Sequence, residues 1–300
     1  MQLFRALLRN GGQILISISR IRKGLRLLKY KALGRPLDPQ LDQDLRVLGL
    51  RFRVWLSVVT RRPLDVRLHH EFNLWAAKGV GEGMDNPHRR IIEQALPKME
   101  LVQEDRVLDL ACGAGLASRL IAGTEARCSL VIGMDISDGM LRHARRSSAQ
   151  YRNVNFVCAP AEHIPLPDNF FTKALSVEAF YYFEHQERVL AELQRVLAPR
   201  GRLFLLICLY RDHAASLATV DDVDVPVHVR SIDEYKRMLH EGGWADVTAE
   251  EFLQQTRKDG NPDVHDRALF LSARKPDVST PQLIQRQQSV KEQSLFESFT

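Results

Sequence analysis

The chain has 300 residues, enough for one α/β domain with extensions and an ample hydrophobic core. No stretch is apolar for the length of a membrane span. The four cysteines show no CxxC pair, which favours buried reduced thiols over a disulfide or metal framework. The net charge is +5, but the first 70 residues hold fifteen Lys and Arg against four acids, which leaves −6 for the remainder. A mildly acidic core argues against nucleic acid as its substrate.

Residues 1–35 form a basic N-terminal extension, and all its charged side chains are Lys or Arg. Apolar residues recur there at helical spacing with Lys and Arg largely on the other faces, at Ile14, Leu15, Ile18, Ile21, Leu25 and Leu28. This basic amphipathic helix is compatible with peripheral contact with an anionic membrane. Packing on the domain or on a second subunit, and a poorly ordered leader, are the alternatives. The short apolar run argues against a secretory signal, whereas the composition also fits an organellar transit peptide.

Residues 36–84 are predicted to hold a linker and a cap segment. Two prolines predict a linker over Gly34–Asp44, and the apolar, arginine-containing stretch Leu45–Thr60 predicts a packed segment. The run HHE at residues 69–71 is not expected to bind a metal. Adjacent histidines point to different faces of a helix, and no second ligand pair follows at a fixed spacing.

The stretch VLDLACGAG, residues 107–115, predicts a buried strand, a tight glycine turn and the start of a helix. Gly113 and Gly115 let the backbone approach a ligand, and the helix offers N–H groups and a positive dipole end. A polar or anionic cofactor group fits there. Nicotinamide dinucleotide enzymes use a similar loop with a ribose-binding acid about 20 residues further on, a position that Asp135 occupies here.

Asp109 discriminates between two cofactor families. It lies late in the predicted strand, four residues before Gly113. A diphosphate disfavours a neighbouring carboxylate, whereas a ligand with a cationic amino group is stabilised by it. The spacing therefore favours a cofactor with an amino acid moiety, and a nicotinamide-dependent oxidoreductase is the weaker alternative.

These residues resemble the class I S-adenosylmethionine-dependent methyltransferases, in particular the small-molecule subgroup (methyltransferase type 11) of the ubiquinone, menaquinone and sterol enzymes. Five segments stand in the family's order: VLDLACGAG, VIGMDIS, AEHIPLPDNFF, LSVEAFYYF and RVLAPRGRLFLL. The resemblance implies an α/β fold with a Rossmann-like, doubly wound, seven-stranded sheet, one strand antiparallel, helices on both faces and a helical N-terminal extension. It implies S-adenosyl-L-methionine as the cofactor. It also implies that the segment around Trp75 caps the cofactor, with ordinary packing on the sheet as the alternative.

The resemblance places the cofactor at the carboxyl ends of the first three strands. The amino acid moiety is expected to contact Asp109, Ala111, Cys112, Gly113, Ala114 and Gly115. Asp135 is expected to accept from both ribose hydroxyls. The adenine is expected to lie among Ile136, Met140, Ala161 and Glu162.

The chain departs from the family at two positions. Pro160 stands where many relatives have an acid that binds the adenine amino group, and Thr172 stands where an Asp often begins the fourth strand. Neither change removes a reacting group. We therefore expect a different arrangement of the cofactor contacts and not a loss of binding.

Glu178 follows the fourth predicted strand and reaches the edge at which ligands of open α/β sheets bind. The next residues, AFYYF, suit methyl transfer from a sulfonium, since ring faces stabilise a cation and exclude water. Glu178, Tyr181 and Tyr182 are therefore expected to face the acceptor. His228 lies in an insertion that covers the acceptor in this family, and it is a candidate general base. The alternative is a surface histidine without a role.

The expected domains are the extension 1–35, the linker and cap 36–84, the methyltransferase domain 85–275 and a disordered Gln- and Ser-rich tail 276–300. The expected function is transfer of the methyl group by SN2 displacement to a small, partly apolar acceptor. The expected location is cytoplasmic or peripheral to a membrane. The accepting atom and the oligomeric state are left open, and a non-catalytic S-adenosylmethionine-binding module at a membrane is the other alternative.

Overall fold

The computed structural model describes residues 39–80, 85–217, 225–253 and 267–277. The predictions for residues 1–35 and for the tail from residue 278 onward lie outside the described residues. The chain divides into two compact units, with the boundary after Phe52, and the sheet belongs to the second. None of the described helices is both long and apolar enough to cross a membrane.

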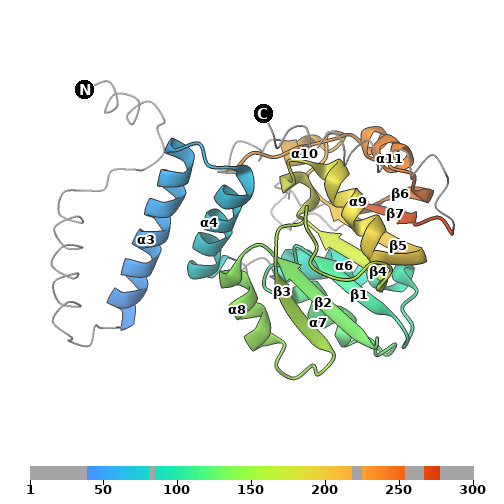
Figure 1. Ribbon diagram of the computed structural model, residues 1–300, viewed down its shortest axis with the longest axis horizontal. Coiled ribbons are helices and arrows are strands. Elements are labelled where there is room, and N and C mark those ends of the chain that lie inside the picture. The colour runs from blue at the N-terminus through green and yellow to red at the C-terminus, as the bar shows by residue number, and fades with distance from the viewer. Residues whose placement is uncertain (1–38, 81–84, 218–224, 254–266, 278–300) are drawn as a thin grey trace. The chain divides into compact units, whose positions relative to one another are not determined.

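Seven strands form one sheet in the order β3-β2-β1-β4-β5-β7-β6 (Figure 1). They are β1 (Arg106–Leu110), β2 (Leu130–Asp135), β3 (Val154–Cys158), β4 (Phe171–Val177), β5 (Leu197–Ile207), β6 (Ala245–Leu253) and β7 (Arg267–Arg274). Strands β1 to β5 pair in parallel, whereas β7 is antiparallel to both of its neighbours. The chain order reverses between β1 and β4, so ligands are expected at the carboxyl ends there. The predicted doubly wound fold with one antiparallel strand is confirmed.

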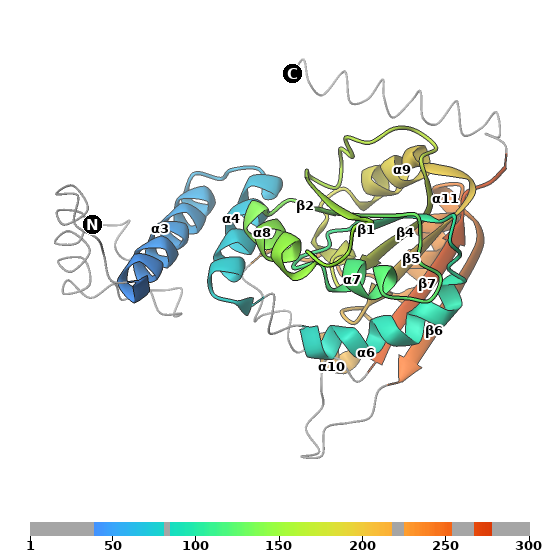
Figure 2. The ribbon, with the colours of Figure 1, turned by 90° about the horizontal axis from the view of Figure 1, so that it is seen from below.

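Helices cover both faces of the sheet (Figure 2). α6 (Asp85–Ala95) and α7 (Leu116–Ala122) lie on one face, with α9 (Gln186–Val196) and α11 (Ile232–Glu241) on the other. The other helices are α3 (Pro39–Val59), α4 (Leu64–Ala77), α8 (Asp138–Ser147) and α10 (Ala214–Leu217), with 3-10 turns η1 (Leu96–Met99) and η2 (Phe180–Tyr182).

Alternating side chains of the strands build two hydrophobic cores. Val107 and Leu175 pack in the core that contains α6 and α7, whereas Leu108 and Ala174 pack in the core that contains α9 and α11. Because β1 and β4 are apolar on both faces, they are buried on both faces. These rigid central strands end at the glycine loop and at Glu178.

The predicted linker over Gly34–Asp44 is wrong from Pro39 onward, because α3 begins there. A proline in the first turn of a helix needs no partner for an N–H group, and its fixed φ suits the helix. Asp42 of this first turn pairs with Arg46 one turn later, at 2.8 Å.

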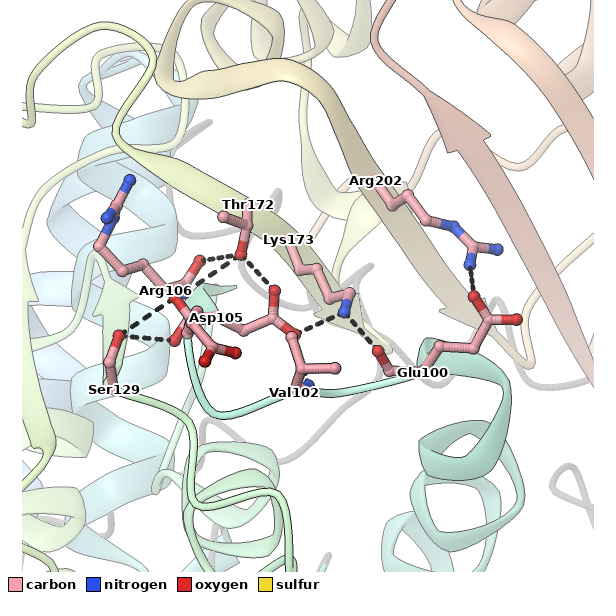
Figure 3. A network of polar contacts seen from close by, with 9 residues as sticks. Glu100, Val102, Asp105, Arg106, Ser129, Thr172, Lys173 and Arg202 are labelled. Atoms are coloured by element: carbon pink, nitrogen blue, oxygen red, sulfur yellow. Dashed lines mark hydrogen bonds and ion pairs between the residues drawn. The ribbon is translucent and has the colours of Figure 1, made fainter.

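A buried ion pair lies at the amino ends of β1 and β4 (Figure 3). Lys173 Nζ donates to Asp105 Oδ2 at 2.5 Å and to the Glu100 carbonyl at 2.6 Å. Thr172 Oγ1 donates to Asp105 Oδ1 at 2.6 Å, and the Val102 N–H donates to Oδ2. Burial alone raises the pKa of Asp105, but the hydrogen bonds from Lys173 and Thr172 hold it below its ordinary value. Thr172 therefore belongs to a structural network at the edge away from the glycine loop.

Candidate active site

A cavity of about 470 Å³ lies at the carboxyl ends of the central strands, at the point where the strand order reverses. The predicted cofactor residues that line it are Asp109, Ala111, Cys112, Gly113, Ala114, Asp135, Ile136, Met140, Ala161 and Glu162. The predicted acceptor-side residues that line it are Glu178, Tyr181 and Tyr182. The sheet thus brings together residues from four separate segments of the chain.

The loop after β1 has a left-handed backbone at Ala111 (φ 57°), Gly113 (φ 53°) and Gly115 (φ 79°). Gly115 is not a lining residue, because it caps the N-terminus of α7. A Cβ on Gly115 would lie 3.0 Å from Ala144 Cβ and 3.1 Å from the Phe156 ring. Glycine is therefore required at this position for the backbone conformation and for the close packing of α7.

Asp109 is buried at the end of β1 and accepts a hydrogen bond from Ser118 Oγ of α7 at 2.6 Å. Burial raises the pKa of this carboxyl to about 6, although the hydrogen bonds from Ser118 oppose the shift. A cationic group bound beside Asp109 favours its ionised form. This part of the cavity therefore suits a protonated amino group.

Asp135 ends β2 with its carboxylate oriented by two backbone N–H groups. Oδ2 accepts from Gly113 and Oδ1 accepts from Ser137, each at 2.8 Å. Burial raises the pKa of Asp135, and the two backbone hydrogen bonds oppose that shift. A carboxylate has lone pairs left for two neighbouring hydroxyls after accepting two hydrogen bonds. The loop after β1 and the turn after β2 are thus fixed to one another around a group that fits ribose.

The side of the cavity predicted for adenine combines apolar residues with Glu162, which interacts electrostatically with His185, Asp65 and Glu184 of the same cavity lining. Met140 and Ala161 are buried, and Ile136 lies next to Asp135. Burial raises the pKa of Glu162. Pro160 also lines the cavity, so the position at which many family members have an acid supplies apolar surface here.

Glu178 follows β4 with a positive φ of 53°, an uncommon backbone conformation for a residue with a side chain. Its carboxyl group accepts from the Cys208 N–H after β5 and from the Tyr181 hydroxyl, the latter at 3.3 Å. Burial raises the pKa of Glu178 to about 7. The Tyr181 and Tyr182 ring centroids are 4.6 Å apart, and Phe72 of α4 packs edge-on against Tyr182 at 5.3 Å. A carboxyl that titrates near neutral pH therefore lies beside an aromatic wall.

His228 is the predicted acceptor-side residue that does not line the cavity. Its N–H donates to the Tyr181 carbonyl at 2.7 Å, and its own carbonyl accepts from Gln186 Nε2 at 3.2 Å. Its Nε2 is buried and has no hydrogen-bond partner among the described residues. His228 thus supports the backbone of the aromatic segment, and the geometry does not favour it as a general base.

Sequence reasoning missed most of the contribution of α4. Side chains on one face of this helix line the cavity, namely Leu64, Leu68, Phe72 and Trp75. Their spacing of three and four residues is the signal of an apolar helical stripe, but such a stripe faces a core as readily as a ligand. The sequence therefore predicts an apolar stripe on this helix but not whether the stripe faces the core or the cavity.

The HHE run lies on α4 and contacts other residues of the domain. Within the described part of the chain, no group of three or more His, Cys, Asp or Glu is placed to hold a metal ion. His69 instead contacts the Ile136 carbonyl through Nδ1 at 2.9 Å. Glu71 accepts from Trp75 Nε1 at 2.8 Å within the same helix.

Comparison with known proteins supports the same chemistry. A sequence profile described as a methyltransferase domain matches residues 108–205. The chain is 30% identical over 198 residues to 27-O-demethylrifamycin SV methyltransferase of Amycolatopsis mediterranei, a match that covers 63% of this chain and 71% of that protein. It is 27% identical over 203 residues to methyltransferase GfsG of Streptomyces halstedii, with 63% and 70% covered. It is 39% identical over 119 residues to demethylmenaquinone methyltransferase of Thermus thermophilus, with 39% and 52% covered.

A solved structure shows the same fold. A methyltransferase in complex with the Trm112 methyltransferase activator of Haloferax volcanii matches with a TM-score of 0.62 at 24% identity, over 69% of this chain and 98% of that one. The profile and the curated relatives decide between the two cofactor families in favour of S-adenosylmethionine. The chain belongs to the class I S-adenosylmethionine-dependent methyltransferases, and S-adenosylmethionine is its methyl donor.

Proposed function

We propose that this enzyme transfers the methyl group to a small, partly apolar acceptor. The observation that supports this most directly is the order of the strands, because β2, β1 and β4 lie side by side and place Asp135, Asp109 and Glu178 at or next to their carboxyl ends. Neighbouring strands are about 4.8 Å apart, so the outer two acids of this row are separated by about 10 Å, which lets the three carboxyl groups contact different groups of the bound molecules. When bound, S-adenosylmethionine would supply a methyl group on a sulfonium. An electron pair of the acceptor would attack this methyl carbon in one SN2 step while the S–CH3 bond breaks and S-adenosylhomocysteine leaves.

In the cofactor half of the proposal, the amino acid moiety and the ribose of the cofactor each contact one buried acid. Asp109 and the loop Ala111–Gly115 bind the amino acid moiety, and Asp135 binds the ribose hydroxyls. Both carboxylates are buried and hydrogen-bonded, so they are oriented before a ligand arrives. The adenine lies among Ile136, Met140, Ala161 and Glu162.

The acceptor half combines aromatic ring surface with a buried carboxyl group. Phe72, Tyr181 and Tyr182 provide ring surface, and Glu178 is the carboxyl group next to it. Because the pKa of Glu178 is about 7, its ionised form is available near neutral pH to take a proton from an acceptor hydroxyl or activated carbon. The names of two relatives specify demethylmenaquinone and 27-O-demethylrifamycin SV, which supports a partly apolar acceptor.

Calorimetry tests the cofactor half. S-adenosylhomocysteine and NAD are titrated separately into the wild type, into Asp135→Ala and into Asp233→Ala, a control acid on the exposed face of α11. We expect S-adenosylhomocysteine to bind the wild type and the control equally, and Asp135→Ala at least about tenfold more weakly, since hydrogen bonds to a charged group contribute about 1.5–3 kcal/mol. Preferential binding of NAD would contradict the assignment.

Labelled methyl transfer tests the acceptor half. Hydroquinones, phenols and hydroxylated macrocycles are incubated with methyl-labelled S-adenosylmethionine and the wild type, Glu178→Gln or the exposed control Glu187→Gln. We expect the wild-type rate to rise as pH passes about 7, and we expect Glu178→Gln to retain S-adenosylhomocysteine binding but to lose turnover and this pH dependence. Equal turnover by wild type and Glu178→Gln at all pH values would remove Glu178 from the mechanism.

A further inference from the structure

A chain of polar side chains connects α4 to the turn after β2. α4 and α8 lie side by side in both views (Figures 1 and 2). His69 Nδ1 is 2.9 Å from the Ile136 carbonyl, and Asn73 Nδ2 is 3.1 Å from His69 Nε2. Asn73 Oδ1 accepts from Ser137 Oγ at 2.9 Å and from the Gly139 N–H at 2.7 Å. We call His69 and Asn73 the α4 latch.

The donors and acceptors of the α4 latch fit one arrangement. The Ile136 carbonyl can only accept, so His69 Nδ1 carries the proton and Nε2 accepts from the Asn73 amide. The Asn73 oxygen is then available for both of its donors. Ser137 Oγ, which donates to that oxygen, accepts in turn from the Met140 N–H. Asn73 and Ser137 are buried, whereas the His69 side chain is 37% exposed and its Nε2 is 3.9 Å from Asp138 Oδ1. The paired donors and acceptors of the two buried side chains favour one geometry.

α4 and α8 approach each other closely at Gly139. A Cβ on Gly139 would lie 2.5 Å from Asn73 Oδ1 and 3.1 Å from Ala76 Cβ. The first turn of α8 therefore meets α4 this closely only because residue 139 is a glycine. Asn73 and Ser137 are both buried at this contact.

The α4 latch holds the residues that follow Asp135. Ile136 and Ser137 are the next two residues in the chain, and the Ser137 N–H is one of the two groups that orient the Asp135 carboxylate. On α4, Leu68 and Phe72 line the cavity one position before His69 and Asn73. One helix thus contacts the turn at the ribose-binding acid and forms a wall of the acceptor cavity.

We propose that His69 and Asn73 are positioning residues that fix the turn after Asp135 and thereby couple cofactor binding to the placement of the acceptor wall on α4. This inference rests on the proposed role of Asp135. Neither residue touches the reacting atoms. Because coupling is reciprocal, a cofactor that binds more tightly when the latch is formed also stabilises α4 when it binds.

Calorimetry with S-adenosylhomocysteine tests the first half of the coupling. The variants are His69→Ala, Asn73→Ala and their double mutant, with His70→Ala as the matched control on the same helix. We expect His70→Ala to bind like the wild type and each latch variant about tenfold more weakly, because each loses hydrogen bonds that hold the turn after Asp135. The double mutant is expected to bind no more than about threefold more weakly than the weaker single mutant, because both residues act in one network. Asn73→Asp keeps acceptor oxygens for Ser137 and Gly139 and should recover part of the affinity.

Hydrogen exchange of α4 tests the second half. At a temperature at which thermal unfolding shows every variant to be folded, S-adenosylhomocysteine at saturation should slow amide exchange in α4 of the wild type and of His70→Ala, but not of Asn73→Ala. A residue that only supports the fold would change thermal stability and leave this ligand-dependent protection intact.

The outcomes separate this inference from the proposed function. If the wild type binds S-adenosylhomocysteine and Asp135→Ala does not, while both latch variants keep the wild-type Kd and the protection of α4, the latch has no positioning role and the proposed function stands. If the wild type itself does not bind S-adenosylhomocysteine, both are wrong.

Discussion

Two buried carboxylates at opposite ends of β1 have opposite environments. Asp105, just before the strand, accepts from the ammonium group of Lys173 and from Thr172. Asp109, near the other end, accepts from the neutral hydroxyl of Ser118. The hydrogen bonds from Lys173 and Thr172 hold the pKa of Asp105 below its ordinary value in spite of burial, whereas burial raises the pKa of Asp109 to about 6. One short strand thus holds one carboxylate with its counter-ion and one that is suited to receive a cation.

The difference assigns a task to each edge of the sheet. When a buried acid is paired with a cation of the same chain, removal of the cation destabilises the fold strongly, because the acid is left buried without compensation. A buried acid whose charge is poorly compensated lowers the stability of the empty enzyme. A cationic ligand that binds beside it stabilises its ionised form. We infer that the residues at the amino ends of β1 and β4, the amino edge of the sheet, stabilise the fold. Asp109, near the carboxyl end of β1, lowers the stability of the empty enzyme and favours ligand binding.

Removal of the cation at the amino edge should have the largest effect. Lys173→Met leaves the Asp105 carboxylate buried without its ammonium partner, so we expect the free energy of unfolding to fall by about 3–5 kcal/mol. Urea denaturation monitored by circular dichroism measures this. The Kd for S-adenosylhomocysteine, determined where the variant is folded, should stay within about twofold of the wild type, because it is set at the other edge. A large loss of affinity with unchanged stability would reverse the assignment of tasks.

The pH dependence of stability should have opposite signs for the two acids. The folded pKa of Asp109, about 6, exceeds the unfolded value of about 3.9, so the folded chain binds more protons between these values and stability falls as pH rises through about 4–6. One pKa unit corresponds to about 1.4 kcal/mol, so the free energy of unfolding of Asp109→Asn should exceed that of the wild type by up to about 3 kcal/mol above pH 7. Below about pH 4 the two free energies should be nearly equal.

Asp105 provides the contrast for that measurement. Its folded pKa lies below the unfolded value, so its contribution is present above the unfolded pKa and is lost as pH falls through the folded one. Asp105→Asn should therefore be less stable than the wild type at neutral pH, with a difference that shrinks in acid. Urea titrations of the apo enzyme at several pH values measure the stability of each variant relative to the wild type. If both variants are more stable than the wild type at neutral pH, or both less stable, the comparison is contradicted.

Asp109→Asn should also weaken cofactor binding while it stabilises the empty enzyme. Loss of the charge beside the amino group should raise the Kd of S-adenosylhomocysteine by about tenfold or more, since a charged hydrogen bond contributes about 1.5–3 kcal/mol. Methylthioadenosine lacks the amino acid moiety, so it should bind the variant and the wild type alike. Equal weakening of both ligands in calorimetry would indicate a distorted loop and not a lost charge.

The part of the site that could be predicted is the part with local signals. The strand, the glycine turn and the helix over residues 107–121 are contiguous, and Asp135 follows at a spacing that a βαβ unit imposes. Tertiary contacts carry no such signal. Lys173 is 68 residues from Asp105, and Asn73 is 66 residues from Gly139, so neither pair can be read from a pattern along the chain.

The predictions that failed or were incomplete share a physical reason. Pro39 predicts a break, but it stands in the first turn of α3, where a proline is tolerated. His228 has the right chemistry for a base, but it is not among the described residues that line the cavity, and its backbone N–H donates to the Tyr181 carbonyl, so its role as a base stays a prediction. In each case the residue type allows two roles, and the packing of distant segments selects one.

Arg202→Met should have the smallest effect, and it sharpens the comparison within the amino edge. Arg202 pairs with the Glu100 carboxylate at 2.8 Å, and the Glu100 carbonyl accepts a hydrogen bond from Lys173, so Glu100 connects the Arg202 ion pair to the ion pair of Lys173 with Asp105 (Figure 3). The Arg202 pair is much more exposed than the Lys173 pair, and a pair of that kind contributes about 0–1 kcal/mol. Urea denaturation should therefore show a loss several times smaller than for Lys173→Met, and added salt should reduce it further. If Arg202→Met and Lys173→Met lost equal stability, an exposed ion pair would contribute as much as a buried one. Burial of the Asp105 charge would then not explain the loss of stability in Lys173→Met.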